Sequence, residues 1–138
     1  MSPQLLDDSV LVVDNDVEAL EEMAEALRDD GLTVHTASNE HAALKLAKEH
    51  RPEFIIMDYL LDGYTGTEVV NDIYKFLPET QVIMISAFEG LSRIMRTMNS
   101  GVIDVLQKPL TIDTLCLFIR SKLEQKHQQL GPSRQRNI

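Results

Sequence analysis

The sequence predicts an α/β three-layer sandwich, in which a parallel five-stranded sheet lies between two layers of helices. Short apolar runs alternate with helical patterns five times along the 138 residues. Three of these runs are apolar almost throughout, which is typical of parallel strands covered on both faces. Strands that alternate with helices in this way form one sheet through right-handed crossovers, so five strand-helix units are expected.

The expected strands are short and rich in Val, Ile and Leu. They cover residues 10–13, 32–37, 54–57, 82–86 and 102–106. The second run is the most polar, because His35 and two threonines interrupt it. This composition suits an edge of the sheet, where one side of the strand faces solvent.

Residues that can cap a helix stand before four of the expected helices: Asn15, Ser38, Thr65 and Thr111. A glutamate follows Asn15 and Thr65 at the third position, which is the spacing of a capping box. The remaining helix is expected from apolar residues at helical spacing, with Gly101 as its left-handed stop. These apolar residues are Leu91, Ile94, Met95 and Met98.

We expect one domain over residues 1–130. A chain of 138 residues with 43% hydrophobic content can build one core and is too short for two. Gly131 and Pro132 stand where they would stop the last helix. Residues 131–138 are therefore expected to form a disordered tail.

Charge and composition exclude several classes of function. A net charge of -9 argues against direct nucleic-acid binding, because most of the surface would repel phosphate. No secretion signal is recognisable at the N-terminus, and no apolar run approaches the ~18 residues that would span a bilayer, so no membrane contact is expected. The single cysteine, Cys116, cannot form an internal disulfide and fits a reducing compartment. We therefore expect a cytoplasmic protein.

Polar side chains follow the strands where a parallel sheet collects its functional groups. The residues that leave the strands there are Asp14, Asn15, Asp16, Asp58, Ser86 and Lys108. In open α/β sheets, ligands bind outside the carboxyl ends of the strands, at the crevice where the strand order reverses. The sequence therefore predicts a site that combines carboxylates, a hydroxyl group and one ammonium group.

Four short motifs carry a resemblance to a known family. They are "VLVVDND", "FIIMD" followed eight residues later by Gly66, "VIMISA" and "LQKP". Each fragment alone is a weak signal, but four in order at the ends of the right strands are specific. Over residues 9 to about 126 the sequence resembles the receiver domain of two-component response regulators. The resemblance implies a flavodoxin-like sheet of order 2-1-3-4-5.

The resemblance also implies roles for the residues after the strands. Asp58 stands in the place of the phosphoacceptor, which takes a phosphoryl group from a histidine kinase or a phosphotransfer protein. Lys108, in a bond to Pro109 that is often cis in this family, and Ser86 would contact phosphoryl oxygens. Such a domain is not an enzyme beyond catalysing its own phosphorylation.

A magnesium ion is the cofactor that the resemblance implies. Its ligands would be Asp58, Asn15 and the backbone carbonyl of Leu60, with Asp14 acting directly or through a water. Mg²⁺ prefers hard oxygen ligands and keeps several waters, so a few protein oxygens suffice. The phosphorylated domain would then present a changed surface, made by the fourth helix, fifth strand and fifth helix, to a downstream protein.

Three residues depart from the family pattern. Asn15 replaces a second acidic residue, which removes one negative charge from the expected metal site. Val105 stands where an aromatic ring often moves with the hydroxyl residue, and a β-branched side chain is stiff at χ1. Asp62 replaces a common proline in the loop after Asp58.

Two alternative functions stay open at the level of sequence. Asn15 and Val105 are consistent with a receiver that has lost phosphorylation and acts as a docking module. The segment "VVDNDVE" partly matches the motif of haloacid-dehalogenase-like phosphatases, with Asp14 as nucleophile and Asp16 as general acid. That match fails at Glu18, where the motif has Thr or Val, and after the lysine only Asp113 is acidic where the motif has a pair.

Overall fold

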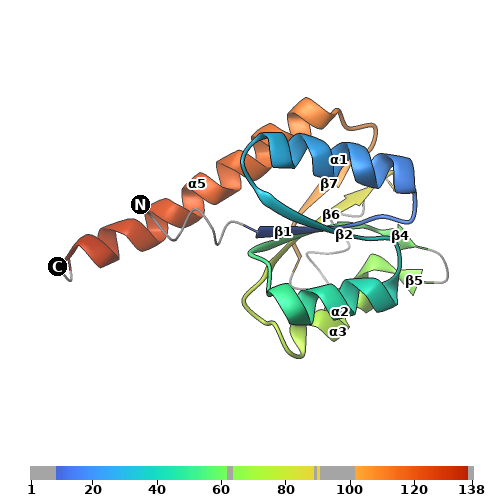
Figure 1. Ribbon diagram of the computed structural model, residues 1–138, viewed down its shortest axis with the longest axis horizontal. Coiled ribbons are helices and arrows are strands. Elements are labelled where there is room, and N and C mark those ends of the chain that lie inside the picture. Colours follow the sequence, from blue (N-terminus) through green and yellow to red (C-terminus); the bar gives the residue numbers. More distant parts are fainter. Residues whose placement is uncertain (1–8, 62–63, 89, 91–101, 137–138) are drawn as a thin grey trace.

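The structure is a computed structural model of the chain, and it describes residues 9–61, 64–88, 90 and 102–136 (Figure 1). The helix expected around the apolar stripe at residues 91–98, its stop at Gly101 and the loop residue Asp62 lie outside the described residues. The predictions for these positions therefore stay predictions.

A parallel sheet forms the middle layer. Its strands are β1 (Ser9–Val13), β2 (Thr33–Ala37), β3 (Phe54–Asp58), β6 (Gln81–Ser86) and β7 (Val102–Gln107). They lie in the order β2-β1-β3-β6-β7, and all neighbours are parallel. This confirms the predicted flavodoxin-like order, with the polar strand β2 at an edge. Each expected strand agrees with the observed one to within about a residue, which is the usual uncertainty of an element's end.

Two short strands were not predicted. β4 (Leu60–Leu61) and β5 (Tyr64–Thr65) form an antiparallel pair directly after β3. Two residues on each side are too few to produce a recognisable alternation of apolar and polar side chains. The hairpin matters because it shapes the loop that follows Asp58.

Helices cover both faces of the sheet. The helices α1 (Val17–Asp29) and α5 (Ile112–Arg136) pack on one face, and α2 (Glu40–His50) and α3 (Gly66–Tyr74) on the other (Figure 1). Alternate residues of the strands supply the two cores, as the pleat requires. In β1, for example, Val10 and Val12 face α1 and α5, whereas Leu11 and Val13 face α2 and α3.

Two of the predicted helix caps were wrong by one residue. The cap of α1 is Asp16 and not Asn15, and its carboxylate accepts the N–H groups of Glu18 and Ala19. The cap of α2 is Asn39 and not Ser38. In both places two adjacent residues can cap, and the path of the chain out of the strand decides which one does.

The other two predicted caps stand where the sequence indicated. Thr111 precedes α5 and accepts the N–H of Thr114 through its hydroxyl oxygen. Thr65 precedes α3, but its hydroxyl contacts that of Thr67 and makes no capping hydrogen bond. The capping box predicted at Thr65 is therefore right in position and wrong in its bonding.

The predicted end of the last helix was wrong. α5 continues through Gly131 and Pro132 to Arg136 and projects away from the body of the domain (Figure 1). A proline fixes φ near −65°, which a helix accepts, and its cost is one backbone hydrogen bond and a local clash. The domain limit at residue 130 stays a prediction.

Two ion pairs attach α5 to the sheet. The ammonium group of Lys126 lies 2.8 Å from the Glu53 carboxylate at the start of β3, and also over the ring of Phe54. Lys122 lies 3.8 Å from Asp104 in β7. Among the described residues, no helix is both long enough and apolar enough to cross a bilayer.

Candidate functional site

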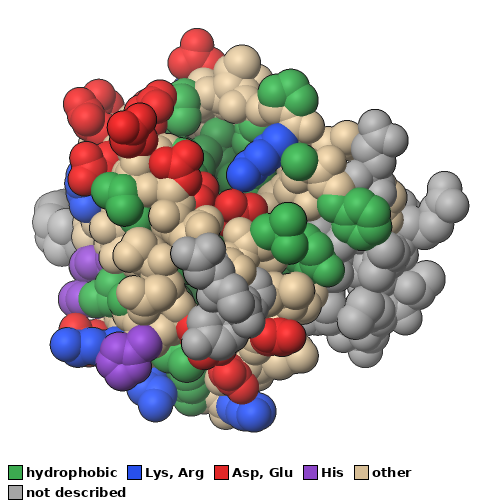
Figure 2. Space-filling view, turned by 90° about the vertical axis from the view of Figure 1, so that its right-hand side faces the viewer, with side chains coloured by type: hydrophobic (Ala, Val, Ile, Leu, Met, Phe, Trp, Pro, Cys, Tyr) green, Lys and Arg blue, Asp and Glu red, His purple; other side chains and the backbone are tan. Residues whose placement is uncertain are grey.

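The register of the parallel strands brings the predicted polar residues to one edge of the sheet. Val13 of β1 pairs with Met57 of β3, so Asp14 and Asp58 follow side by side. Asp58 pairs with Ile85 of β6, which places Ser86 next. Figure 2 looks onto this edge of the molecule, where acidic side chains gather toward the top and a basic side chain lies beside acidic ones near the centre.

Asp14 is a buried carboxylate at this edge of the sheet. The residue is 3% exposed, and one carboxylate oxygen accepts the backbone N–H of Asp16 at 2.9 Å. Burial raises the pKa of Asp14 above its ordinary value, and the nearby charge of Asp58 raises this pKa further. The Asp16 N–H bond and the charge of Lys108 act against the shift without cancelling it. A cation bound here would therefore stabilise the ionised form.

Asp58 and Lys108 form an ion pair across fifty positions of sequence. The Lys108 ammonium nitrogen lies 3.3 Å from a carboxylate oxygen of Asp58. Asp58 is largely buried, with 12% of its side chain exposed, whereas 42% of the Lys108 side chain is exposed. The backbone N–H of Lys108 donates to the Ser86 carbonyl, and the Lys108–Pro109 bond is cis, as the resemblance implied.

Ser86 ends β6 as a buried hydroxyl group. The residue is 3% exposed, and its hydroxyl oxygen accepts the backbone N–H of Phe88 at 2.9 Å. A hydroxyl that already accepts can still donate its own hydrogen to a further acceptor. Ser86 is thus bonded on the loop side and retains a donor for the site.

The loop after Asp58 is tied to the sheet and to α3. The Tyr59 N–H donates to the Ile85 carbonyl at 2.9 Å, and the Gly66 N–H donates to the Tyr59 carbonyl at 2.6 Å. Pairs in an antiparallel ladder alternate between hydrogen-bonded and non-hydrogen-bonded. Because Tyr59 and Gly66 are hydrogen-bonded, the next pair, Leu60 with Thr65, is of the other kind. In a regular ladder, the carbonyl of a residue in such a pair points away from the partner strand.

Gly66 is a site residue whose physical role the sequence analysis missed. A Cβ at this position would lie 2.8 Å from the backbone oxygen of Asp58 and 2.7 Å from the sulfur of Met84. Both distances are shorter than ordinary carbon contacts. The start of α3 can pack against the end of β3 only because residue 66 lacks a side chain. A glycine in the first turn of an expected helix was the available signal.

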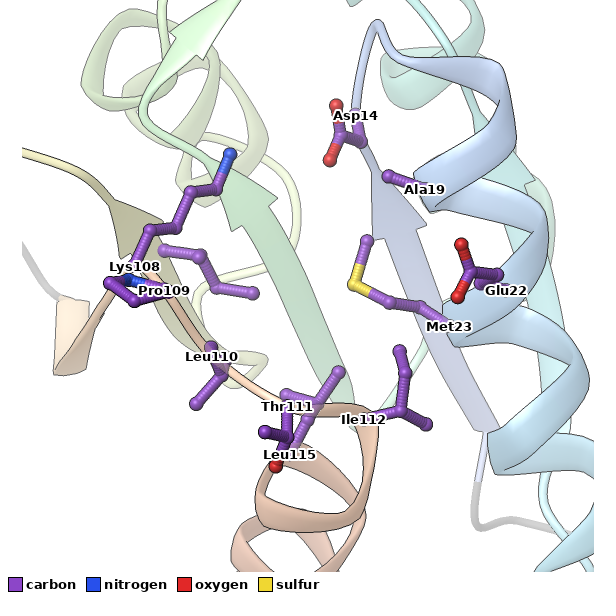
Figure 3. A pocket seen from close by; sticks show the side chains of 11 residues that line it. Asp14, Ala19, Glu22, Met23, Lys108, Pro109, Leu110, Thr111, Ile112 and Leu115 are labelled. Carbon is purple, nitrogen blue, oxygen red and sulfur yellow. The ribbon is translucent and has the colours of Figure 1, made fainter.

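A cavity of about 330 Å³ opens beside the site (Figure 3). Asp14 and Lys108 lie at one end of it, Ile112 and Leu115 lie at the other, and Met23 extends into it from α1. Most of its lining is apolar. The cavity continues the site toward the groove between α1 and α5.

Few of the predicted metal ligands are carboxylates. Only Asp14 and Asp58 among the predicted ligands are acidic, and Asp16 uses its carboxylate to cap α1. In the described ranges, His, Cys, Asp and Glu side chains nowhere gather in threes to hold a metal ion. Asn15 is exposed and adjoins Asp14. The predicted ligands are thus two carboxylates, an amide oxygen and the Leu60 carbonyl, and all of these are hard oxygens of the kind that suits Mg²⁺.

Comparison with known proteins agrees with this geometry. The family model of the response regulator receiver domain matches residues 10–120. The heme response regulator HssR of Staphylococcus aureus is 33% identical over 113 residues, which cover 82% of this chain and 50% of HssR. The probable transcriptional regulatory protein TcrX of Mycobacterium tuberculosis is 27% identical over 115 residues, which cover 83% of this chain and 49% of TcrX. The chain thus spans about half the length of these curated relatives.

Solved structures show the same fold. The receiver domain of NtrX from Brucella abortus has a TM-score of 0.74 and 30% identity, and the match covers 83% of this chain and 98% of that one. A CheY-like receiver domain protein from Methanospirillum hungatei has a TM-score of 0.79 and 23% identity, with 88% and 98% covered. The family match, the strand order and the arrangement of the site agree: this chain belongs to the response regulator receiver domain family.

Proposed function

We propose that this chain is a phosphorylatable receiver domain in a phosphorelay. Asp58 accepts a phosphoryl group from a histidine of a kinase or phosphotransfer protein, and the domain then changes the surface that it offers to a protein partner. The observation that carries this proposal is the ion pair at 3.3 Å between Lys108 and Asp58, beside the buried carboxylate of Asp14. Receiver domains are signalling modules, and a cytoplasmic location is part of the proposal.

The transfer needs a carboxylate that can attack and a positive charge that offsets repulsion. A carboxylate oxygen of Asp58 forms a bond to phosphorus as the bond from phosphorus to the histidine nitrogen breaks. The electron pair of the broken bond returns to the imidazole ring. Charge builds on the phosphoryl oxygens during this step, and fixed positive groups stabilise it. The 3.3 Å contact between Lys108 and Asp58 supports this role for the ammonium group, and the Ser86 hydroxyl has a hydrogen to donate to one of the oxygens.

Receiver domains generally bind Mg²⁺ at their acidic phosphorylation site, and the donors of this chain fit that ion. Asp14, Asp58, the Asn15 amide oxygen and the Leu60 carbonyl would hold it, and waters would complete the six ligands that it prefers. When bound, the ion would supply positive charge that offsets the repulsion of the carboxylates and the phosphoryl oxygens. The pairing of Leu60 with Thr65 supports its part in this set, because a regular ladder would turn the Leu60 carbonyl away from β5. Because residue 15 is Asn, this set carries one negative charge fewer than it would with an acidic residue beside Asp14.

The downstream partner is proposed to bind the face that β7 and α5 form with the helix expected before β7. Of this face, β7 and α5 belong to the described residues. No nucleic-acid contact is proposed for the chain itself, because its net charge is -9.

A docking module without phosphorylation is the second candidate. One observation in its favour is that only two acidic side chains, Asp14 and Asp58, are among the predicted ligands, whereas three would bind a cation more tightly. Another is Val105, which is half-buried and packs against the core on the α2 and α3 side. The phosphatase alternative is less consistent with the structure. Its general acid would be Asp16, and that carboxylate accepts two N–H groups at the start of α1.

The proposal is tested with a small phosphodonor such as acetyl phosphate, with and without Mg²⁺. We expect the intact protein to gain one base-labile phosphoryl group only with Mg²⁺, and the Asp58→Asn variant to gain none. A wild-type protein that stays unmodified under these conditions would support the docking module instead. Turnover of a phosphate ester that Asp14→Asn abolishes and Asp58→Asn leaves intact would support the phosphatase.

A further inference from the structure

The cavity beside the site lies between α1 and the start of α5 (Figure 3). Apolar walls with a few polar groups are typical of sites that bind small organic molecules. A Mg²⁺ ion would use only the end of this space near Asp14, because it prefers oxygen ligands and water. The apolar part therefore suits another kind of ligand. Its lining consists of Ala19, Met23, Ile85, Leu110, Ile112 and Leu115.

The charges around this cavity favour a cation. Asp14 and Glu22 are acidic residues of its lining, and Asp14 is 3% exposed. The Lys108 ammonium group also lines the cavity, but it already lies 3.3 Å from the Asp58 carboxylate. An anionic ligand would have to compete with Asp58 for Lys108 and would be repelled by both acidic residues of the lining. A cationic ligand would be attracted by them.

The outer face of α1 extends this negative charge. Glu18, Glu21 and Glu25 are exposed on the same helix as the exposed Glu22. A surface of one sign raises the local concentration of ions of the opposite sign and speeds their encounter with the protein. A small cation would therefore be drawn toward the cavity.

The size and chemistry of the cavity define the ligand further. If each non-hydrogen atom takes the roughly 30 Å³ of a water molecule, a volume of about 330 Å³ holds about ten of them. An amidinium group is planar and has paired N–H donors, as a guanidinium group does, and this geometry matches a carboxylate. An aromatic body would contact Ile112 and Leu115, and the flexible Met23 side chain can adapt to its shape.

We propose that this cavity binds a small organic cation, with its amidinium or ammonium group on Asp14 and its apolar body between α1 and α5. Asp14 is also one of the ligands proposed for Mg²⁺, so the organic cation and Mg²⁺ would compete there. Each would then weaken the binding of the other by the same factor. Phosphorylation of Asp58 would become slower when the organic cation is bound. The binding stands on the cavity and its charges, whereas this effect on phosphorylation rests on the proposed function.

The binding is tested with 4-methylbenzamidine, a cation of about this size, by NMR on protein with methyl-labelled methionine. The chain has 6 Met residues, and a Met23→Leu variant assigns the Met23 signal. The Met23 resonance is expected to move and to saturate as the compound is added. Met57 and Met84 are fully buried in the core on the other face of the sheet, so their resonances should stay in place.

Two compounds of the same shape are the controls for charge. 4-Methylbenzamide is neutral and 4-methylbenzoate is an anion, so the amidine should bind at least about tenfold more tightly than either. Equal binding of all three compounds would indicate apolar contact alone and would overturn the inference. An unmoved Met23 resonance with the amidine would overturn it as well.

Two pairs of variants locate the ligand. Ala19→Leu fills part of the cavity and should weaken binding at least about tenfold, whereas Ala42→Leu, on α2 at the other face of the sheet, should not change it. Glu22→Gln should weaken binding about threefold, and Glu25→Gln, at an exposed position outside the lining, should have less effect. Unchanged affinity in an Ala19→Leu protein that unfolds at the wild-type urea concentration would place the ligand elsewhere and overturn the inference.

Mg²⁺ and acetyl phosphate separate this inference from the proposed function. Added Mg²⁺ should raise the dissociation constant of the amidine, and the amidine should slow formation of the Asp58 adduct at limiting Mg²⁺. An affinity for the amidine that does not depend on Mg²⁺ would overturn the competition at Asp14. Absence of the adduct without the amidine would overturn the proposed function and leave the binding site standing. A normal adduct with an unmoved Met23 resonance would overturn the binding site alone.

Discussion

Replacing Gly66 by alanine tests whether close packing behind Asp58 holds the site in position. A Cβ at residue 66 would lie 2.7 Å from the Met84 sulfur, 2.8 Å from the Asp58 backbone oxygen and 2.9 Å from a Met57 side-chain carbon. The two methionine side chains are flexible and can yield. The Asp58 oxygen cannot yield without moving the end of β3, which carries the acceptor carboxylate.

The size of the effect follows from these contacts. An extra methyl group in a tightly packed place costs about 1–3 kcal/mol. Alanine favours a helix over glycine by at most about 1 kcal/mol, and less in the first turn. The clash therefore dominates, and we expect the free energy of unfolding to fall by about 2 kcal/mol. For a domain of this size, that lowers Tm by roughly 5–10 °C.

The assay combines urea unfolding with the rate of Asp58 phosphorylation by acetyl phosphate. Gly31→Ala is the matched control, because Gly31 has a φ of +93° but open space around its Cβ position. The control should lose about 1 kcal/mol through backbone strain and should be phosphorylated at the wild-type rate. Gly66→Ala should lose stability and react more slowly at equal folded fraction. A Gly66→Ala protein within about 0.5 kcal/mol of wild type, with an unchanged rate, would refute the packing argument.

Three further predictions concern charge. Asn15→Asp restores a carboxylate at the cation site, so titration calorimetry should show at least about fivefold tighter Mg²⁺ binding, and equal affinity would contradict the proposed ligand set. Burial raises the pKa of Asp14, so the folded state binds a proton more tightly than the unfolded state and stability falls as pH rises through that pKa. At pH 7 without Mg²⁺, Asp14→Asn should therefore unfold at a higher urea concentration than the wild type. A lower unfolding midpoint for this variant would refute the prediction. Burial and the charge of the nearby His50 lower the pKa of His35. The unfolded state therefore takes up the proton first, and stability declines as pH falls from about 6.5. His35→Gln should flatten this slope, with the exposed His41→Gln as the control.

The order of the elements and the identity of the site residues could be predicted because both rest on local patterns. The apolar runs that became β1, β3 and β6 are continuous, and such runs form buried parallel strands with few alternatives. Asp14, Asp58 and Ser86 could be placed at one edge because the carboxyl ends of parallel strands meet there. Caps were less predictable. The side chains of Asn15 and Asp16 can both cap a helix, and only the direction of the chain after β1 selects Asp16.

The sequence by itself determined which residues form the five strands of the main sheet and which polar side chains leave these strands. It also determined that the residue after Asp14 is the uncharged Asn15. These properties depend on residue type and spacing over a few positions. Tertiary structure alone decided the 3.3 Å contact of Lys108 with Asp58, the packing of Gly66 against β3, and the stacking of Phe88 on Tyr59. The physical reason is that each of these contacts joins separate elements, and its distance depends on the register and twist of the whole sheet.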